Sequence, residues 1–406
     1  MRTSIIKTSL IGGVFVCVLS CAARHSRLPS PELVEQVNYQ RARAAQLLNQ
    51  GDFQTALNIL EDVNSRMPND AWTLGLLGWA QWKTGSFKEA VGNFEESLRR
   101  DYLNHLTHLR FAQMLIEQGK IGRALTEFEL AVKYGSSDPL AHYNYGLALY
   151  KTGRKEEALI EWQQAYDLDR SDPKYAEAMG MGLTGTDDRR ALYYFEKANS
   201  LGVEGPSFHH NFALLLQRLG DHDRAEREFQ RALEKDPDNA SYRFGLAAFY
   251  TNAGSYEKAL PIWKGLVEQS PGDLSYRIHF ARTLLELGRF QEAISVLEPI
   301  EAGQGMDGET PKTIAIGEAG TGPVSVDDAF GILAMSYRGL GDLEKANLFI
   351  EKALDINSES VEHLNNYGVI LAERGMIDRA RIQWQKVLEI EPDNETARQN
   401  LSASGR

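Results

Sequence analysis

Residues 139–172 read PLAHYNYGLALYKTGRKEEALIEWQQAYDLDRSD, and this stretch decides how the chain folds. One amphipathic run ends at Gly153, and a second amphipathic run follows that glycine. Gly146 in the first run and Ala158 in the second are small, so they stand where two helices would have to touch. A single helix hairpin cannot bury its own apolar faces, so the stretch predicts neighbours of the same kind.

The same pattern recurs along most of the chain. Each copy has an alanine in its second helix, and an apolar or aromatic residue follows one helical turn later, as Trp162 follows Ala158. The steps between these alanines are 34 residues, except for one of 33 and one of 53, at Ala56, Ala90, Ala124, Ala158, Ala191, Ala225, Ala259, Ala293, Ala346 and Ala380.

This register resembles the tetratricopeptide repeat, a helix-turn-helix unit of 34 residues. The resemblance covers about residues 37–394 and implies an all-α fold, a right-handed α-solenoid of about ten helix-turn-helix units. The predicted segments are units 1–4 at 37–172, a degenerate unit 5 at 173–205, units 6–8 at 206–301, units 9–10 at 327–394, and a polar capping helix and tail at 395–406.

Two interruptions stand out in this register. The first helix of unit 5 contains AEAMGMGLTGTD at 176–187, and each of its three glycines costs about 1 kcal/mol relative to alanine. We therefore expect a short, weak or bent helix there, and a hinge between two rigid blocks. Residues 302–326 are rich in glycine and lack helical periodicity, which predicts an inserted loop. Long loops are often functional or disordered, and the sequence leaves both readings open.

The N-terminus has the features of an export signal. A short basic start precedes an apolar run that is about half the length needed to span a bilayer. Residues 18–22 read VLSCA and resemble the bacterial lipobox, which implies a signal peptide at 1–20, cleavage before Cys21 and lipid attachment to Cys21. Ala22, rather than Asp, follows the cysteine, and by the same resemblance implies sorting to the outer membrane, with the body in the periplasm. An uncleaved signal anchor or a plain secretory signal is the alternative.

Residues 21–36 then comprise the lipidated cysteine, a short polar tether and the start of the first helix. Ser30 followed by Pro31 predicts that this helix begins with an N-cap and a proline in its first turn. Several acyl chains on one cysteine would make the membrane anchoring stable, because one chain alone is marginal.

Composition and motifs argue against chemistry in the body of the chain. The formal net charge is −12, which disfavours sequence-independent nucleic-acid binding. The two cysteines lie at 17 and 21, so the body has no thiol for catalysis or metal binding. Two glycine motifs, at 180–185 and 303–308, lack the strand-turn-helix context of a dinucleotide site. We expect no catalytic residues, no cofactor and no metal site, and interpret the histidines at 105, 108, 209 and 210 as solvated or capping residues.

The first helix of each unit lines the concave side in the family that the chain resembles. Positions 2, 5, 9 and 12 of that helix share one face, and position 6 borders it. This face is aromatic in units 2 and 4, and asparagines at position 6 resemble those that hold a peptide backbone in peptide-binding relatives. The candidate groove residues are Trp72, Trp79, Trp82, Leu109, Gln113, Ile116, Tyr143, Asn144, Tyr150, Asn211 and Asn366. The alternative is that the rings simply pack against the preceding unit or the N-terminal helix.

We therefore expect a non-catalytic protein-interaction scaffold. By its resemblance to outer-membrane lipoproteins of this repeat class, it would assemble or stabilise an envelope complex for pili and secretins, secretion or polysaccharide export. Its partners would be envelope proteins, with the membrane reached through the lipid anchor. A chaperone-like periplasmic holder of exported polypeptides is the alternative, and an accessory repeat array of an enzyme system is a third class.

Overall fold

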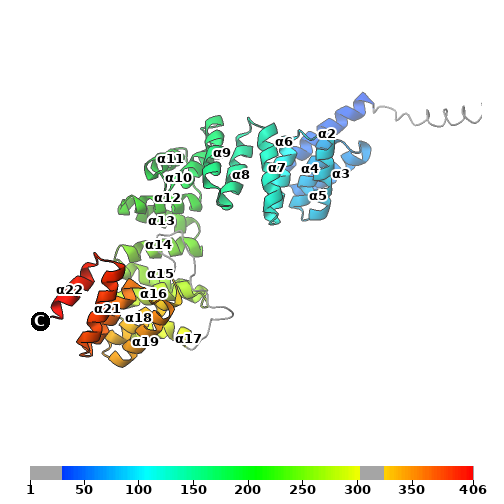
Figure 1. Cartoon of the computed structure of the whole chain (residues 1–406). Helices are drawn as coiled ribbons and strands as arrows, with labels where there is room; N and C mark the ends of the chain where they lie inside the picture. The colour runs from blue at the N-terminus through cyan, green and yellow to red at the C-terminus, as the bar shows by residue number, and fades with distance from the viewer. Residues whose placement is uncertain (1–29, 302–323, 406) are drawn as a thin grey trace, which may run out of the picture. The chain divides into compact units, whose positions relative to one another are not determined.

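The computed structural model describes residues 30–301 and 324–405, and these residues form the helices α2 to α22 (Figure 1). The helices belong to two compact parts of the chain, which divide between Arg170 and Ser171. Each part contains several repeat hairpins, and the two parts are called the first unit and the second unit. No helix in the described part of the chain is both long enough and apolar enough to cross a bilayer. The all-α prediction is confirmed, whereas the predictions for residues 1–29, including Cys21, and for most of the inserted loop lie outside the described residues.

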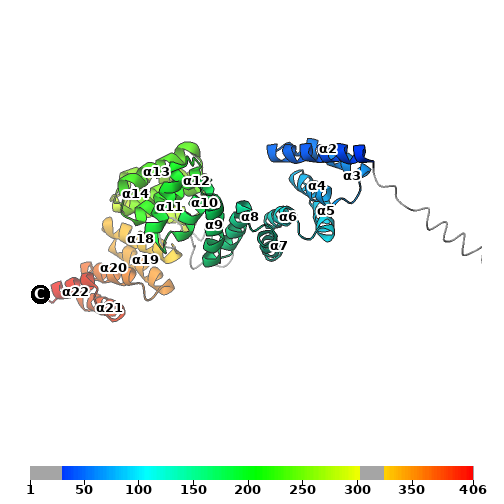
Figure 2. The ribbon, with the colours of Figure 1, turned by 90° about the horizontal axis from the view of Figure 1, so that it is seen from above.

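The first unit consists of four helix hairpins. In each hairpin the first helix packs against the second, and consecutive hairpins also contact each other. Figure 2 shows these helices from a second direction. The helices are α2 (Pro31–Gln50), α3 (Phe53–Arg66), α4 (Ala71–Lys83), α5 (Phe87–Arg100), α6 (His105–Glu117), α7 (Ile121–Tyr134), α8 (Pro139–Lys151) and α9 (Lys155–Leu168).

The second unit continues the same alternation and ends in one extra helix that packs against α21. Its helices are α10 (Pro173–Leu183), α11 (Asp188–Ser200), α12 (Pro206–Arg218), α13 (His222–Lys235), α14 (Ala240–Asn252), α15 (Tyr256–Gln269), α16 (Leu274–Glu286), α17 (Phe290–Glu301), α18 (Val326–Gly339), α19 (Leu343–Ile356), α20 (Val361–Glu373), α21 (Ile377–Ile390) and α22 (Glu395–Ala403).

Local sequence sets where these helices begin and end. The Ser30 hydroxyl accepts a hydrogen bond from the backbone N–H of Leu33 at 3.2 Å, with Pro31 in the first turn, so the predicted N-cap is confirmed. Gly153 has a φ of +80°, a left-handed conformation that favours glycine, and its N–H donates to the Tyr150 carbonyl at 3.0 Å. The chain can therefore reverse between α8 and α9 within three residues.

Small residues at the helix crossings make room for large rings. Gly146 of α8 lies directly against the indole of Trp162 in α9, and a Cβ at residue 146 would overlap that ring. Trp162 is fully buried, and its Nε1 donates a hydrogen bond to the Tyr143 carbonyl at 3.2 Å. Trp263 and Trp384 are buried in the same way, which confirms that these three tryptophans are core residues.

Helix α10 is 11 residues long, whereas α8 and α12 each have 13. Gly180 and Gly182 of the first glycine motif lie inside this helix rather than at a strand-to-helix turn. A Cβ at Gly180 would come within 2.7 Å of Phe195 Cδ2, so this glycine serves helix packing. The hinge stays a prediction.

The histidines correct one expectation. His108, His209 and His210 are buried rather than solvated. The reason is geometric, because these positions of α6 and α12 point toward packed neighbours instead of solvent. His210, for example, lies against Phe229 and Tyr242, with ring centroids 5.7 and 5.1 Å away.

A histidine at position 4 connects the two helices of its own hairpin. In three units its Nδ1 lies 2.7 Å from a glutamate oxygen of the second helix, in the pairs His108–Glu127, His142–Glu161 and His209–Glu228. The partners are 19 residues apart each time. The sequence signal, a histidine followed by glutamate at this fixed spacing, is visible only when the units are aligned.

The other ring nitrogen reaches back to the loop before the hairpin. His108 Nε2 donates to the Tyr102 carbonyl at 2.9 Å, and His142 Nε2 to the Ser136 carbonyl at 3.2 Å. In His142 both ring nitrogens face acceptors, which favours the charged ring. Burial opposes that charge on His142, but the hydrogen bonds to Glu161 and Ser136 outweigh it and raise the pKa of His142.

Candidate functional site

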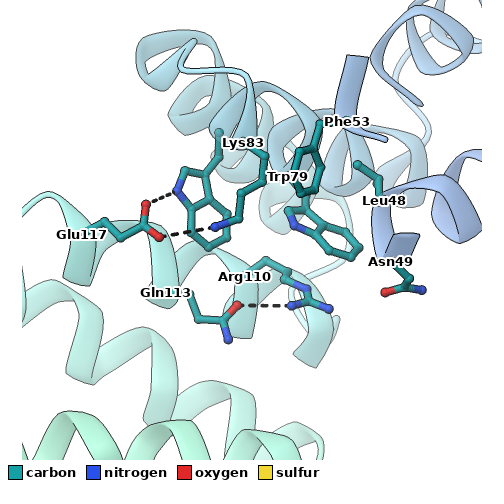
Figure 3. A pocket seen from close by; sticks show the side chains of 9 residues that line it. Leu48, Asn49, Phe53, Trp79, Lys83, Arg110, Gln113 and Glu117 are labelled. Atoms are coloured by element: carbon teal, nitrogen blue, oxygen red, sulfur yellow. Dashed lines mark hydrogen bonds and ion pairs between the residues drawn. The ribbon is translucent and has the colours of Figure 1, made fainter. Parts of the chain in front are cut away.

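Two adjoining hollows lie along the first helices of the first three hairpins, and we call them together the trough. The hollow in Figure 3 has a volume of about 470 Å³ and is lined from α2, α3, α4 and α6. The second has a volume of about 770 Å³ and continues past Trp72 to the start of α6. Asn49, Trp79 and Arg110 line both hollows, so they form the centre of the trough.

An arginine stacked on a tryptophan occupies that centre. Arg110 Cζ lies 3.9 Å from the centroid of the Trp79 ring, and its Nη1 donates to Gln113 Oε1 at 3.3 Å (Figure 3). Among the described residues, no carboxylate comes within ion-pair distance of Arg110. Burial lowers the pKa of the guanidinium, and the charge of Asp138 partly offsets this, yet an arginine stays charged at neutral pH.

The end of the trough near the C-termini of α4 and α6 is closed by an internal network (Figure 3). Trp82 Nε1 donates to Glu117 Oε2 at 2.6 Å, and Lys83 Nζ lies 3.3 Å from Glu117 Oε1. The same ammonium group stands 3.6 Å from the centroid of the Trp82 ring. Each charge at this end therefore has a partner within the protein.

At the opposite end, Arg41 of α2 lies over Trp72, with Cζ 4.7 Å from the ring centroid. Arg41 is also hydrogen-bonded to Asp70, the N-cap of α4, and to Asn38. Burial alone would raise the pKa of Asp70, but hydrogen bonds from Thr73 and Arg41 hold that pKa below its usual value. Arg41 is thus a paired cation, in contrast to Arg110.

The repeat register can now be compared with known families. Models described as "Tetratricopeptide repeat" match residues 109–176 and 210–273, residues 47–100 and 253–307, and residues 327–360. The chain belongs to the tetratricopeptide repeat family. Arrays of this family typically act as non-catalytic scaffolds that bind protein partners, and the repeats make this chain a protein-interaction scaffold.

Solved structures of other tetratricopeptide proteins resemble the chain at low sequence identity. One, titled as a functional characterization of Pseudomonas aeruginosa pilF, is 18% identical, with a TM-score of 0.48 over 52% of this chain and 97% of that chain. A tetratricopeptide repeat protein from Parabacteroides merdae is 17% identical, with a TM-score of 0.43 over 66% and 98%. Yeast Tom70 is 14% identical, with a TM-score of 0.41 over 91% and 95%. The comparison with curated proteins finds no match.

The structure places four of the predicted groove residues of this tetratricopeptide array in the trough: Trp72, Trp79, Trp82 and Gln113. Trp72 is 46% exposed, whereas Trp79 and Trp82 are only 9% and 5% exposed. The two inner rings therefore form the floor of the trough, and Trp72 offers the largest open aromatic surface.

Leu109 is a correction, because it is fully buried and belongs to the core of the first unit. Position 5 of α6 faces the neighbouring helices, so its side chain offers nothing to a partner. Ile116 is partly buried and packs against the same core. Tyr143 and Tyr150 are half-buried in α8 and do not line either hollow, and the Tyr150 ring packs 5.3 Å from the Trp162 centroid.

The asparagines at position 6 do not share one environment. Asn144 donates to the Leu140 carbonyl of its own helix at 2.7 Å, which uses one of its two donors. Asn211 Nδ2 lies 3.8 Å from Met181 Sδ, and Asn366 is partly buried in α20. None of the three lines the trough.

Sequence reasoning missed Arg110, although the signal was present. Arg110 occupies position 6 of α6, the same register position at which the asparagines were sought. An arginine at this position can donate more hydrogen bonds than an asparagine and also carries a charge. Among residues 30–301 and 324–405, no three His, Cys, Asp or Glu side chains gather closely enough to hold a metal ion.

Proposed function

We propose that the chain is a membrane-anchored scaffold that assembles or stabilises a bacterial envelope complex by binding a partner protein in the trough. The trough is the observation that carries this proposal. Trp and Arg are the residues that most often dominate binding energy at protein interfaces, and here three tryptophans and Arg110 line adjoining hollows. The exposed Trp72 and Arg110, which has no ion pair among the described residues, both gain from a partner that covers them.

The anchoring part of the proposal rests on the sequence VLSCA at 18–22. A lipid on Cys21 would hold the body at the periplasmic face of the outer membrane, and the tether would keep the trough near other envelope proteins. Growth with a labelled fatty acid tests this step in the full-length chain. We expect the label on the wild type and on Cys17→Ala, and none on Cys21→Ala, because the two cysteines differ only in their place relative to the lipobox. Label retained by Cys21→Ala would refute lipid attachment.

The partner-binding part is tested by crosslinking in membranes followed by affinity capture. Trp72→Ala removes exposed ring area at one end of the trough, and Ile160→Ala, on the second helix of another hairpin, is the matched control that also removes an exposed apolar side chain. We expect a small defined set of captured proteins that is lost with Trp72→Ala and kept with Ile160→Ala. Equal capture by both variants would exclude the trough, and a broad unselective set would favour a holder of unfolded polypeptides.

A further inference from the structure

We propose that the trough binds an extended protein segment in which one acidic side chain stands between two large apolar side chains, each two residues away. This inference rests on the proposed function, because it names the segment that the trough takes. Three features of the first unit lead to it: the charge at the centre, the walls on either side, and the length between the ends.

The centre of the trough is complementary to an anion. Arg110 has its flat face on Trp79 and one N–H directed to Gln113, which leaves further donors of its guanidinium fork unused. A carboxylate is the natural complement, since the planar fork can bind it through two parallel hydrogen bonds. The other charged groups that line the hollows already have partners within the protein. Glu117 pairs with Lys83, His105 Nε2 lies 3.8 Å from Asp138 Oδ2, and Asp101 Oδ1 accepts a hydrogen bond from the backbone N–H of Leu103 at 3.3 Å. Among the described residues that line the trough, Arg110 is therefore the arginine or lysine without a carboxylate partner, and it favours an acidic side chain in the ligand.

The walls on either side of this centre are complementary to apolar groups of a ligand. The hollow in Figure 3 presents Leu48, Phe53 and Trp82 beyond Arg110. The second hollow presents Trp72 and Leu106, both about half-exposed, on the other side of it. A ligand that ended at Arg110 with a terminal carboxylate would leave one hollow empty. An internal acidic residue, with chain continuing in both directions, fills both.

The length of the trough fixes the spacing. The lining residues of α4 run from Trp72 to Lys83, which is about 16 Å of helix at 1.5 Å per residue. Five residues of extended chain cover about the same distance at 3.3 Å each. Side chains one, three and five of an extended segment point to the same face, so an apolar, an acidic and an apolar residue can all enter the trough together.

A randomised peptide pool tests the inference on the purified full-length chain. The probe is a mixture of acetylated, amidated nonapeptides whose five central positions are random, and the peptides retained by immobilised protein are sequenced. We expect Asp or Glu at the middle position to be enriched about tenfold, the scale of a charge-assisted hydrogen bond, together with large apolar residues two positions away on each side. A second pool with no acidic residues and a free C-terminal carboxylate should be retained weakly.

Three variants separate charge from shape. Arg110→Gln should lose the preference for acids while keeping that for apolar residues, and Arg110→Lys should restore part of the acid preference. Arg43→Gln, an exposed residue of α2, makes the same charge change as the matched control and should behave like the wild type. Circular dichroism melting confirms that each variant is folded before the pools are compared.

The outcomes distinguish this inference from the proposed function. Retained peptides that show apolar preferences but no acidic preference, or an acidic preference unchanged in Arg110→Gln, would overturn the inference and leave the trough as a partner site. Strong retention of the second pool would also overturn it, in favour of a chain terminus as the ligand. Failure of the wild type to retain any peptide would count against peptide binding by the trough altogether.

Discussion

A single added methyl group should have opposite effects at two glycines of the first unit. Gly146→Ala and Gly92→Ala each replace a glycine inside a helix, and alanine is intrinsically favoured there by about 1 kcal/mol. At Gly92 of α5 nothing lies within 4 Å of the new Cβ, so this gain should appear in full. At Gly146 the new Cβ would come within 2.5 Å of Trp162 Cδ1.

The cost at Gly146 follows from what the indole can do. Trp162 is fully buried and its Nε1 is bonded to the Tyr143 carbonyl, so the ring has no free direction in which to move. Overpacking of this kind costs about 1–3 kcal/mol, and loss of the buried hydrogen bond adds about 1 kcal/mol or more. After subtraction of the helix-propensity gain, we expect Gly146→Ala to lower the local stability by about 2 kcal/mol.

Hydrogen exchange measured by mass spectrometry is the suitable assay, because the stability of a repeat array is a sum of local terms. The amides of α8 and α9 should exchange about thirtyfold faster in Gly146→Ala, the factor that corresponds to about 2 kcal/mol, while those of α5 in Gly92→Ala should exchange more slowly. The reasoning would be refuted if Gly146→Ala protected α8 and α9 as well as the wild type does.

Three further predictions concern burial and pH. Ala158→Leu, at a fully buried helix crossing, should lower the free energy of unfolding by about 1–3 kcal/mol, and an unchanged denaturation midpoint would contradict the register. Burial lowers the pKa of His210 and of His279 to about 4. Each neutral ring is therefore tolerated in the fold above pH 6.5, and the free energy of unfolding should fall by up to about 3 kcal/mol per histidine as the pH drops toward 4. His279→Gln should reduce this loss of stability in melting curves recorded at acidic pH. The pKa of His142 is raised instead, so its effect on the free energy of unfolding has the opposite pH dependence. The stabilisation is present below pH 6.5 and is lost as the pH rises through the folded pKa. Glu161→Gln should therefore destabilise the protein more at pH 6 than at pH 9.

The repeat architecture could be predicted because it depends on residues whose roles are local. A glycine at a tight turn, an alanine at a crossing and a ring one turn later can each be recognised from spacing alone, as at Gly153, Ala158 and Trp162. The start of α2 at Ser30 and Pro31 is equally local, since it needs only an N-cap and a proline. These features do not depend on which side chains the neighbouring unit happens to supply.

The trough could be predicted only in part, because exposure depends on neighbours. Trp72, Trp79 and Trp82 share one face of α4, yet of these three only Trp72 remains open, since Arg110 of α6 lies over Trp79 and Glu117 of α6 holds Trp82. Leu109 occupies an equivalent face and is fully buried. Arg110 acquires its role from Trp79 of the preceding hairpin, 31 residues back along the chain, so its register position marks it as a candidate but does not reveal this contact.

The pairing of histidine with glutamate inside one hairpin bears on how such an array can lengthen. Ion pairs such as Arg338–Glu373 join two different hairpins, so the loss of either hairpin would leave a charge without its partner. His108 and Glu127, by contrast, lie in the same hairpin, and the third member of their network is a backbone carbonyl that any preceding loop can offer. A duplicated or deleted hairpin of this type would carry both halves of its bond with it. Units of this design are therefore the ones that recombination can copy without first repairing their contacts.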